Sequence, residues 1–381
     1  MSKRVLVLFF VLLILVAACI NVFPTYAASR TLVVPDDYVT LTDAVGNATA
    51  GDTVLVRAGV YEEQSLKIDK ALTIIGQDQN GTIINFYPAL LGRTELFASG
   101  WASFENAVVI NVDGVVFSNF TINSNGGTIA VFANRTVIAD NKINRSMDCT
   151  SIAVNGHYNN ITGNHIGNYH GLTVAGTFNV IAGNYAKSVS VQYNSNVIYN
   201  NTLGTLILGS SNFSCVSKNM FPPSPIVYST GISLINCYNN DIYANYVANH
   251  TFPFSVWQSE NNTFYHNNFV NNLYLVKDYD WFSTFPNFLD NGFEGNFWSG
   301  YNGSDVNCDG LGDTPYVLDE NLTDNHPLIY PYDIENDVVR ASTSPFLFVA
   351  IVGVVAVVGV GLFLVYLRFY RKNQSRLTNL L

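Results

Sequence analysis

The chain is short of basic residues, and this shortage limits its partners. It has 18 lysines and arginines against 28 aspartates and glutamates. All 28 acidic residues but only 12 basic ones lie between the apolar segments near the two ends, so this middle part carries a formal charge of −16. Such a surface argues against nucleic acid, anionic lipid and polyuronate partners. Neutral glycans and cations remain compatible with it.

Cysteine is also scarce, which argues against folds and sites that depend on it. Four cysteines follow the first apolar segment, namely Cys149, Cys215, Cys237 and Cys308, and no CxxC spacing occurs among them. That spacing gives no indication of zinc, and a large repetitive core needs no disulfide. The pairing of these cysteines stays open. We predict no organic cofactor.

Helical periodicity is missing between Val116 and Phe269, because Gly, Asn and Thr interrupt every apolar window of helical spacing. In its place an aliphatic or aromatic residue precedes an Asn by three positions, eight times. The eight residues are Asn119, Asn141, Asn164, Asn184, Asn201, Asn219, Asn245 and Asn267. Their steps of 22, 23, 20, 17, 18, 26 and 22 residues indicate a solenoid, in which each repeat buries its apolar face against its neighbours.

Each repeat also has a second apolar pair at alternate positions, from Ile129 and Val131 in the first to Leu273 and Leu275 in the last. Alternation predicts short strands, so each repeat is one rung of a parallel β-helix. The Asn residues are predicted at a corner, where Asn tolerates left-handed backbone and stacked amides bond from rung to rung. We assign them a structural role and no catalytic one.

The repeats differ in length almost entirely between the Asn corner and the second strand. Only Lys187 and Ser188 fill this gap in one repeat, whereas residues 222–231 fill it in another. Variable loops on one flank of a regular scaffold are a common place for a binding surface.

The two ends of the chain predict export and anchoring. Residues 1–27 have the basic start, apolar run and small-residue cleavage site of a signal peptide. Residues 346–366 contain no charge and are long enough to span a bilayer, and basic residues follow at once. The positive-inside rule makes residues 367–381 a cytoplasmic tail and places the preceding part outside the cell. Twelve Asn-x-Ser/Thr sequons in that part predict a glycoprotein if the host can glycosylate.

Several segments outside the repeats resemble a known family. They are Gly51–Val56, Gly59–Glu63, Ile68–Lys70, Leu72–Gly76, Gly295–Tyr301 and Gly312–Tyr316. With the Asn repeats they resemble, over about residues 31–332, secreted right-handed parallel β-helix proteins of the NosD type, which are grouped with carbohydrate-binding and sugar-hydrolase β-helices. The resemblance implies a single-stranded, right-handed, all-β solenoid. It also implies a helix near residues 39–48 that covers the otherwise open first edge.

These observations divide the chain into seven parts. They are the signal peptide (1–27), the N-terminal cap and first rungs (28–110), the repeats (111–300), an Asp/Gly-rich capping segment (301–332), a juxtamembrane linker (333–345), the transmembrane helix (346–366) and the tail (367–381).

The capping segment carries a candidate metal site. Asp305, Asn307, Asp309 and Asp313 occupy positions 1, 3, 5 and 9 of a loop with Gly310 at position 6. Alternate oxygen ligands around such a glycine are typical of calcium loops. Tyr316 stands where such a loop usually has its bidentate Glu. A polar turn without metal is the alternative.

Two other sets of residues suggest carbohydrate chemistry. Asp278 and Asp280 are the candidate catalytic pair, at a separation that paired carboxylates of glycoside-cleaving enzymes use, and a solvated loop is the alternative. Tyr246, Trp257, Tyr274 and Trp281 are candidates for stacking on sugar rings, although aromatic stacks are also ordinary in β-helices.

The predicted function is that of a cell-membrane protein, single-pass with an extracellular N-terminal part, which binds neutral glycans or builds the envelope with other envelope proteins. A polysaccharide hydrolase or lyase is the first alternative, and whether the chain is an enzyme stays open. A NosD-like role in metallocofactor assembly is the second. NosD is implied in copper delivery, which calls for soft or imidazole ligands, and here only Met147, Met220 and scattered histidines are available.

Overall fold

The computed structural model describes residues 29–87, 106–124, 127–145, 150–167, 171–224, 226, 228–274, 277–278, 286–319 and 322–336. The predicted signal peptide, transmembrane helix and tail lie outside these residues, as do Asp280, Trp281 and Cys149. Within the described ranges no helix is long and apolar enough to cross a membrane.

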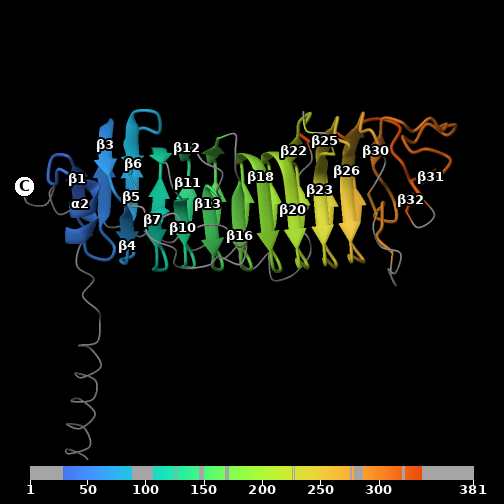
Figure 1. Cartoon of the computed structure of the whole chain (residues 1–381). Coiled ribbons are helices and arrows are strands. Elements are labelled where there is room, and N and C mark those ends of the chain that lie inside the picture. Colours follow the sequence, from blue (N-terminus) through green and yellow to red (C-terminus); the bar gives the residue numbers. More distant parts are fainter. Residues whose placement is uncertain are drawn as a thin grey trace, which may run out of the picture. The chain divides into compact units, whose positions relative to one another are not determined.

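The described chain winds into a parallel β-solenoid, which confirms the predicted all-β architecture (Figure 1). One wall of the solenoid, sheet A, has 11 described strands. They are β1 (Thr31–Val34), β2 (Thr53–Val56), β5 (Thr73–Gly76), β8 (Val116–Ser118), β11 (Val137–Ala139), β14 (Asn160–Thr162), β17 (Val180–Ala182), β19 (Val197–Tyr199), β21 (Cys215–Ser217), β24 (Asp241–Tyr243) and β27 (Thr263–Tyr265).

The other two walls, B1 and B2, are joined into one sheet because two strands run through both. The B1 strands are β3 (Gly59–Glu63), β6 (Thr82–Phe86), β9 (Thr121–Ser124), β12 (Lys142–Arg145), β15 (His165–Ile166), β22 (Met220–Phe221), β25 (Tyr246–Ala248), β28 (Asn268–Val270) and β30 (Phe297–Trp298). The B2 strands are β4 (Leu66–Ile68), β7 (Asn106–Ile110), β10 (Gly127–Val131), β13 (Ile152–Asn155), β16 (Leu172–Ala175), β23 (Thr230–Ile235), β26 (Phe252–Trp257) and β29 (Lys277–Asp278). The shared strands are β18 (Tyr185–Gln192) and β20 (Thr202–Gly209), in the repeats whose loop is shortest.

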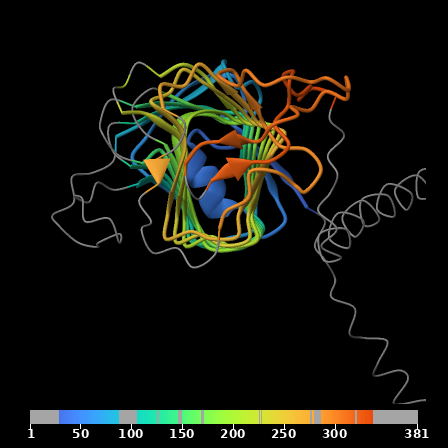
Figure 2. The same cartoon turned by 90° about the vertical axis from the view of Figure 1, so that its right-hand side faces the viewer.

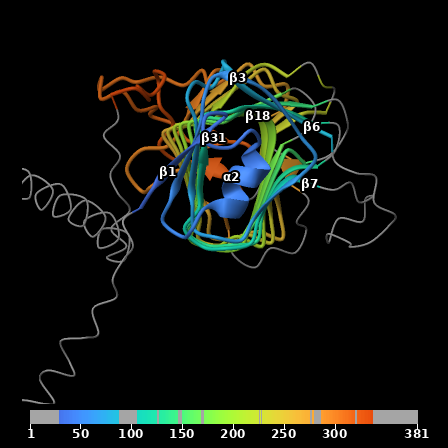
Figure 3. The same cartoon turned by 90° about the vertical axis from the view of Figure 1, so that its left-hand side faces the viewer.

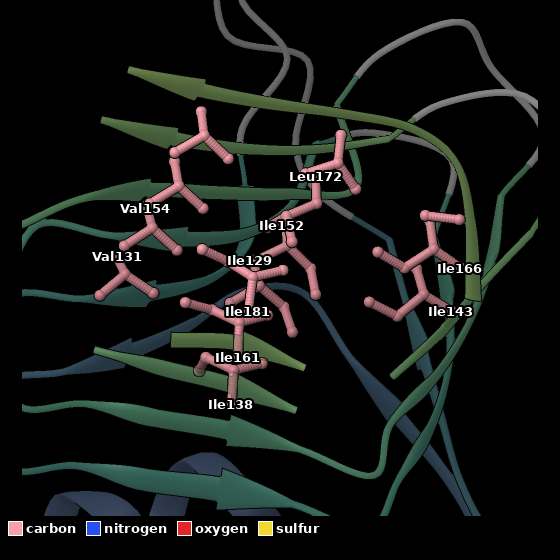
Figure 4. Close-up of a cluster of buried hydrophobic side chains, with 14 of the residues drawn as sticks. Ile129, Val131, Ile138, Ile143, Ile152, Val154, Ile161, Ile166, Leu172 and Ile181 are labelled. Carbon is pink, nitrogen blue, oxygen red and sulfur yellow. The ribbon is translucent and has the colours of Figure 1, made fainter. Parts of the chain in front are cut away.

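The core is a set of mostly aliphatic columns, of which sheet A and B1 each contribute one and B2 contributes two. Because all walls pair in parallel register, equivalent side chains stack directly: Ile129 pairs with Ile152 and Ile138 with Ile161. Figure 4 shows these columns converging inside the solenoid, with Ile143 and Ile166 from B1 opposite them. Each such side chain is almost fully buried and contributes about 1.5–3 kcal/mol to folding.

The predicted helix closes the N-terminal end as α2 (Leu41–Asn47). Thr40 caps it by accepting a hydrogen bond from the Asp43 N–H at 3.0 Å, and Leu41 turns into the core. Lys70 Nζ donates to three carbonyl groups at the helix end, those of residues 45, 46 and 48. Figure 3, viewed from this end, shows α2 across the opening of the solenoid, and it is visible behind the rungs from the other end in Figure 2.

A buried row of Asn residues runs along the corner between sheet A and B1. From Asn164 onward each amide oxygen accepts from the preceding Asn, whereas that of Asn141 accepts from the Phe120 N–H. Each amide nitrogen donates to a backbone carbonyl of the preceding rung. The row contains Asn141, Asn164, Asn184, Asn201, Asn219, Asn245 and Asn267, and it continues to Asn296. For example, Asn184 Nδ2 donates to Asn201 Oδ1 at 3.0 Å and to the Ile161 carbonyl at 2.8 Å.

Asn119 was wrongly predicted to belong to this row. β8 pairs with β11 so that Val116 lies beside Val137, which places Phe120 opposite Asn141 and Asn119 opposite Asp140. Asn119 instead has a positive φ of 70°, and its amide donates to the Gly76 carbonyl. The left-handed residue at this corner is therefore the one before the row, as Asp140 (φ 53°) also shows.

A second buried row, which the repeat pattern did not reveal to us, runs along the corner between B2 and sheet A. Its members are Asn159, Asn179, Asn196, Ser214, Asn240, Asn262 and Asn287, each accepting from the backbone N–H of the member before it. Five of these Asn residues stand five positions before an Asn of the first row, a spacing that would have indicated them.

The last rungs are covered by residues 299–332, including the antiparallel pair β31 (Tyr316–Val317) and β32 (Thr323–Asp324). The last predicted apolar pair was misplaced: Leu273 is 70% exposed, and the strand of that rung is β29. The solenoid belongs to one compact unit, 1–332, and residues 333–381 form another.

Candidate functional site

A pocket lies at the C-terminal end of the solenoid, where B1 turns into B2. It has a volume of about 270 Å³. Its walls are Pro253, Phe269, Trp298, Tyr274 and Tyr316, and Asn271, Asn272 and Ser299 supply polar groups. The lining therefore combines aromatic side chains with polar groups, and both kinds of contact are used in sugar sites.

The aromatic walls are held by contacts with other rings, and Tyr274 has the most exposed ring among them. Tyr274 stacks on Phe252 with ring centroids 5.2 Å apart, yet it is 53% exposed. Trp298 is buried, and its Nε1 donates to Asp324 at 2.8 Å. Tyr316 lies against Trp298 at 5.6 Å, and burial raises the pKa of its hydroxyl, which therefore stays protonated.

The polar groups of the pocket fall into a fixed and a free set. Asn272 is fixed, since its Oδ1 accepts from the His250 N–H at 2.9 Å and its Nδ2 donates to the Val247 carbonyl at 3.0 Å. Asn271 is exposed, and only its backbone N–H is engaged, by Ser299 Oγ at 2.8 Å. Within the described residues the side chain of Asn271 and the Tyr274 hydroxyl have no partner, so both can bond a ligand.

The predicted stacking residues are not gathered at one place. Tyr274 lines the pocket. Tyr246 is half-buried on B1, in register with Met220 and Asn268, and Trp257 is 48% exposed at the end of β26. Trp281 lies outside the described residues. Trp298 and Tyr316, which occur in two of the segments that carry the family resemblance, were not predicted to line a site, because only the folded C-terminal end brings them to the pocket.

The predicted carboxylate pair is described only in part. Asp278 ends β29, and its backbone pairs with Val256. Asp280 lies outside the described residues. Among the described residues that line the pocket there is no Asp or Glu.

The candidate calcium loop is folded around its own carboxylates. Asp305 accepts from the N–H groups of Asp309 and Gly310 at 3.1 and 3.0 Å, and Asp313 accepts from the Val306 N–H at 2.8 Å. Asn307 Nδ2 donates to Asp309 at 2.9 Å. The three aspartates of the loop do not gather into a metal-binding group in the part of the chain that the structure describes. Cys308, in this loop, is a free thiol, as are Cys215 and Cys237.

The parallel walls, with three strands to most rungs, and the capping helix define the chain as a parallel β-helix. Residues 186–303 match the family model described as "Periplasmic copper-binding protein (NosD)". No curated protein is significantly similar to the chain in sequence.

Solved structures with a similar fold are all distant. A PL6 family alginate lyase, AlyGC, is 14% identical with a TM-score of 0.49, and the match covers 78% of this chain and 55% of the lyase. A pectin methylesterase in complex with a hexasaccharide is 14% identical with a TM-score of 0.37, over 61% of this chain and 81% of the esterase. The Dettilon tailspike protein is 12% identical with a TM-score of 0.45, over 72% and 66%. Similarities this low carry no statement about activity.

The described residues do not fit a copper site. No three His, Cys, Asp or Glu side chains among them gather into a metal-binding group. The histidines are dispersed: His157 Nδ1 contacts Thr177 Oγ1 at 2.9 Å, His165 stacks on Tyr185 at 4.6 Å, and His266 Nε2 contacts Glu294 at 2.6 Å. Copper sites need several such ligands or sulfur ligands around one point.

Proposed function

We propose that the chain is a glycan-binding protein of the cell surface, in which the β-helix presents a sugar site and residues 346–366 anchor it in the membrane. The observation that carries the proposal is the pocket lined by Tyr274 and Tyr316, with aromatic rings and amide groups in its walls. Aromatic faces bind the C–H surfaces of a sugar ring, and amides bond its hydroxyl groups.

The charge of the chain favours neutral sugars over acidic ones. The part between the terminal apolar segments carries −16, and no basic residue is among the described residues that line the pocket. A polyuronate would therefore meet repulsion without a compensating cation. The anchor and the signal peptide rest on the sequence alone, and they agree with a ligand in the cell envelope.

The test is to incubate the full-length chain in mild detergent with neutral and acidic envelope and plant polysaccharides, scoring retention and product release separately. We expect retention of a neutral glycan without release of product. Tyr274→Ala should weaken this binding about tenfold, which is the loss of one aromatic contact. Tyr199→Ala is the matched control, because Tyr199 is also exposed but lies on sheet A.

Two results would contradict the proposal. Release of shortened or unsaturated sugars would make the chain a hydrolase or lyase, with Asp278 as the first residue to substitute. Retention of no glycan would leave a structural role in the envelope. Equal retention by the Tyr274→Ala variant would remove the pocket as the sugar site.

A further inference from the structure

A column of surface residues stands outside the second buried row, at the corner between B2 and sheet A. Its members are Arg135, Tyr158, Phe178, Ser195, Phe213, Asn239 and Asn261, all with φ between 52° and 60°. The backbone N–H of each member donates to the carbonyl of the residue that precedes the next member. For example, Phe178 donates to Asn194 and Ser195 donates to Asn212. Because the backbone conformation repeats, the side chains leave the solenoid at equivalent places on successive rungs.

The first half of the column is a continuous stack. The Arg135 guanidinium carbon lies 5.9 Å from the ring centre of Tyr158. The rings of Tyr158 and Phe178 are parallel within 4°, with centroids 5.1 Å apart. Ser195 then interrupts the stack, and Phe213 follows on the next rung with 66% of its surface exposed. One place in the stack therefore carries a hydroxymethyl group in place of a ring.

This interruption has room for one ring. Rungs rise by about 4.8 Å, so Phe178 and Phe213 start about 9.6 Å apart along the solenoid. A ring halfway between them would have the spacing already present between Tyr158 and Phe178, which is 5.1 Å. Among the described residues, no ring stacks on Phe213, and Tyr158 is the one ring that stacks on Phe178.

The rings of the column are not explained by local backbone preference. Left-handed backbone is favourable for Asn and Gly and unfavourable for bulky residues. The same column uses Asn at 239 and 261, so Asn is accepted there by this fold. Tyr158, Phe178 and Phe213 keep aromatic side chains at a conformational cost, and strained surface positions of this kind point to a functional contact.

We propose that the slot formed by Phe178, Ser195 and Phe213 is a second sugar site, which holds one pyranose ring of a neutral glycan between the two phenyl faces. The class of ligand rests on the proposed glycan-binding function, whereas the slot is a separate site from the pocket at Tyr274. Pyranose rings present C–H faces to both phenyl rings. Ser195 is half-buried, and within the described residues its hydroxyl has no partner, so it can bond a ring hydroxyl.

The charges around the column fit a neutral ligand. Its one basic member, Arg135, stands three rungs from Ser195, and its side chain lies 3.5 Å from Asp113. Ser195 and its flanking residues Asn194 and Asn196 are uncharged. An anionic sugar would find no cation among these residues.

The decisive variant is Ser195→Phe, which fills the slot with the side chain that positions 178 and 213 already carry. Asn239→Phe is the matched control, since it adds a phenyl group to the same column at the same φ (58°) without filling the slot. Phe178→Asn removes one wall and replaces it with a residue that suits the backbone. The full-length variants are titrated with cellohexaose and chitohexaose, and the melting temperature is recorded for each.

We expect Ser195→Phe and Phe178→Asn to weaken hexaose binding about tenfold, with no fall in melting temperature, and Asn239→Phe to bind as the unmodified chain does. Equal binding by Ser195→Phe would overturn the slot. If Tyr274→Ala alone abolished binding, the slot would fail while the pocket and the proposed function stood. The assigned ligand would be wrong if the slot variants bound the neutral hexaoses as well as the unmodified chain does, but bound another ligand less well. Acidic hexaoses, neutral-lipid vesicles and a second copy of the chain are the ligands to compare.

Discussion

The backbone N–H of Asn296 donates to Oδ2 of Asp324 at 2.8 Å, so a carboxylate receives the bond that an Asn side chain receives in the preceding rungs. Trp298 Nε1 donates to the same oxygen, also at 2.8 Å. A carboxylate only accepts, so the amide row ends here. Asp324 is fully buried, and this burial raises its pKa to about 6, although the N–H groups of Trp298, Asn296 and His326 act in the opposite direction.

This relationship predicts a pH dependence of stability. The ordinary pKa is 3.8 and the folded value about 6, so between them the folded chain holds a proton that the unfolded chain has lost. The contribution of Asp324 to the free energy of unfolding is therefore complete below about pH 4. As the pH rises through 6 this contribution is lost, and the free energy of unfolding falls by about 3 kcal/mol. Urea unfolding between pH 4 and 8 measures it. The Asp324→Asn variant should lack this component, and an identical pH profile in both proteins would contradict the assignment.

Gly295 is expected to be intolerant of a side chain. A Cβ there would lie 1.8 Å from Asp324 Oδ1, inside the end of the amide row. Gly295→Ala should destabilise the fold by about 2–3 kcal/mol, as overpacking of a rigid site does. Gly46→Ala is the control: nothing lies within 4 Å of its Cβ position in α2, and it should stabilise by about 0.5–1 kcal/mol. Thermal unfolding of both variants measures the contrast, and similar shifts would refute it.

The amide row itself should be costly to interrupt. Asn201 accepts from the Asn184 N–H and Nδ2, and its Nδ2 donates to Asn219 Oδ1 and to the Ile181 carbonyl. Asn201→Ala leaves these buried groups without partners and should cost roughly 3 kcal/mol or more. Asn144→Ala, at an exposed amide bonded to Asn123, should cost about 0.5 kcal/mol. Chemical denaturation would disprove the role of the row if the two losses were equal.

Calcium remains a prediction for the loop from Asp305 to Asp313. Saturating calcium should raise the melting temperature by about 4 °C or more, because a ligand bound only by the folded state stabilises it. Asp305→Asn should remove most of the effect, since it reduces the charge at the first ligand position. If calcium and a chelator left both the melting temperature and the proteolysis pattern unchanged, the loop would be a polar turn.

The repeat predicted the solenoid because its physical requirement is local. An apolar residue three positions before an Asn places one side chain in the core and the other at a corner, and this holds for Ile138 and Asn141 as for Ile242 and Asn245. At Asn119 the same spacing occurs one position out of register. Only the pairing of Val116 with Val137 decides between the two frames, and pairing is a property of two rungs together.

The pocket was less accessible to sequence analysis for the opposite reason. Tyr274 was identified as a candidate from its residue type. Trp298 stands two positions after Asn296, in register with Phe269, but this rung was not recognised as a repeat, and Tyr316 comes from a segment without a repeat period. Their position depends on the bond between Trp298 and Asp324 and on the pairing of β31 with β32. Long-range contacts of this kind leave no periodic mark in the chain.

The two buried rows also restrict how such a chain can change over generations. Both rows need one member at each rung. From Thr136 to Asn267, the length of each corner that holds a row differs by at most one residue between neighbouring repeats. The corner between B1 and B2 has no continuous row in this region, and its length varies widely. It is shortest in β18, which passes from B1 to B2 without a break, and much longer between β22 and β23. New insertions are therefore tolerated along one edge of the molecule, where loops can diversify while the interior stays the same.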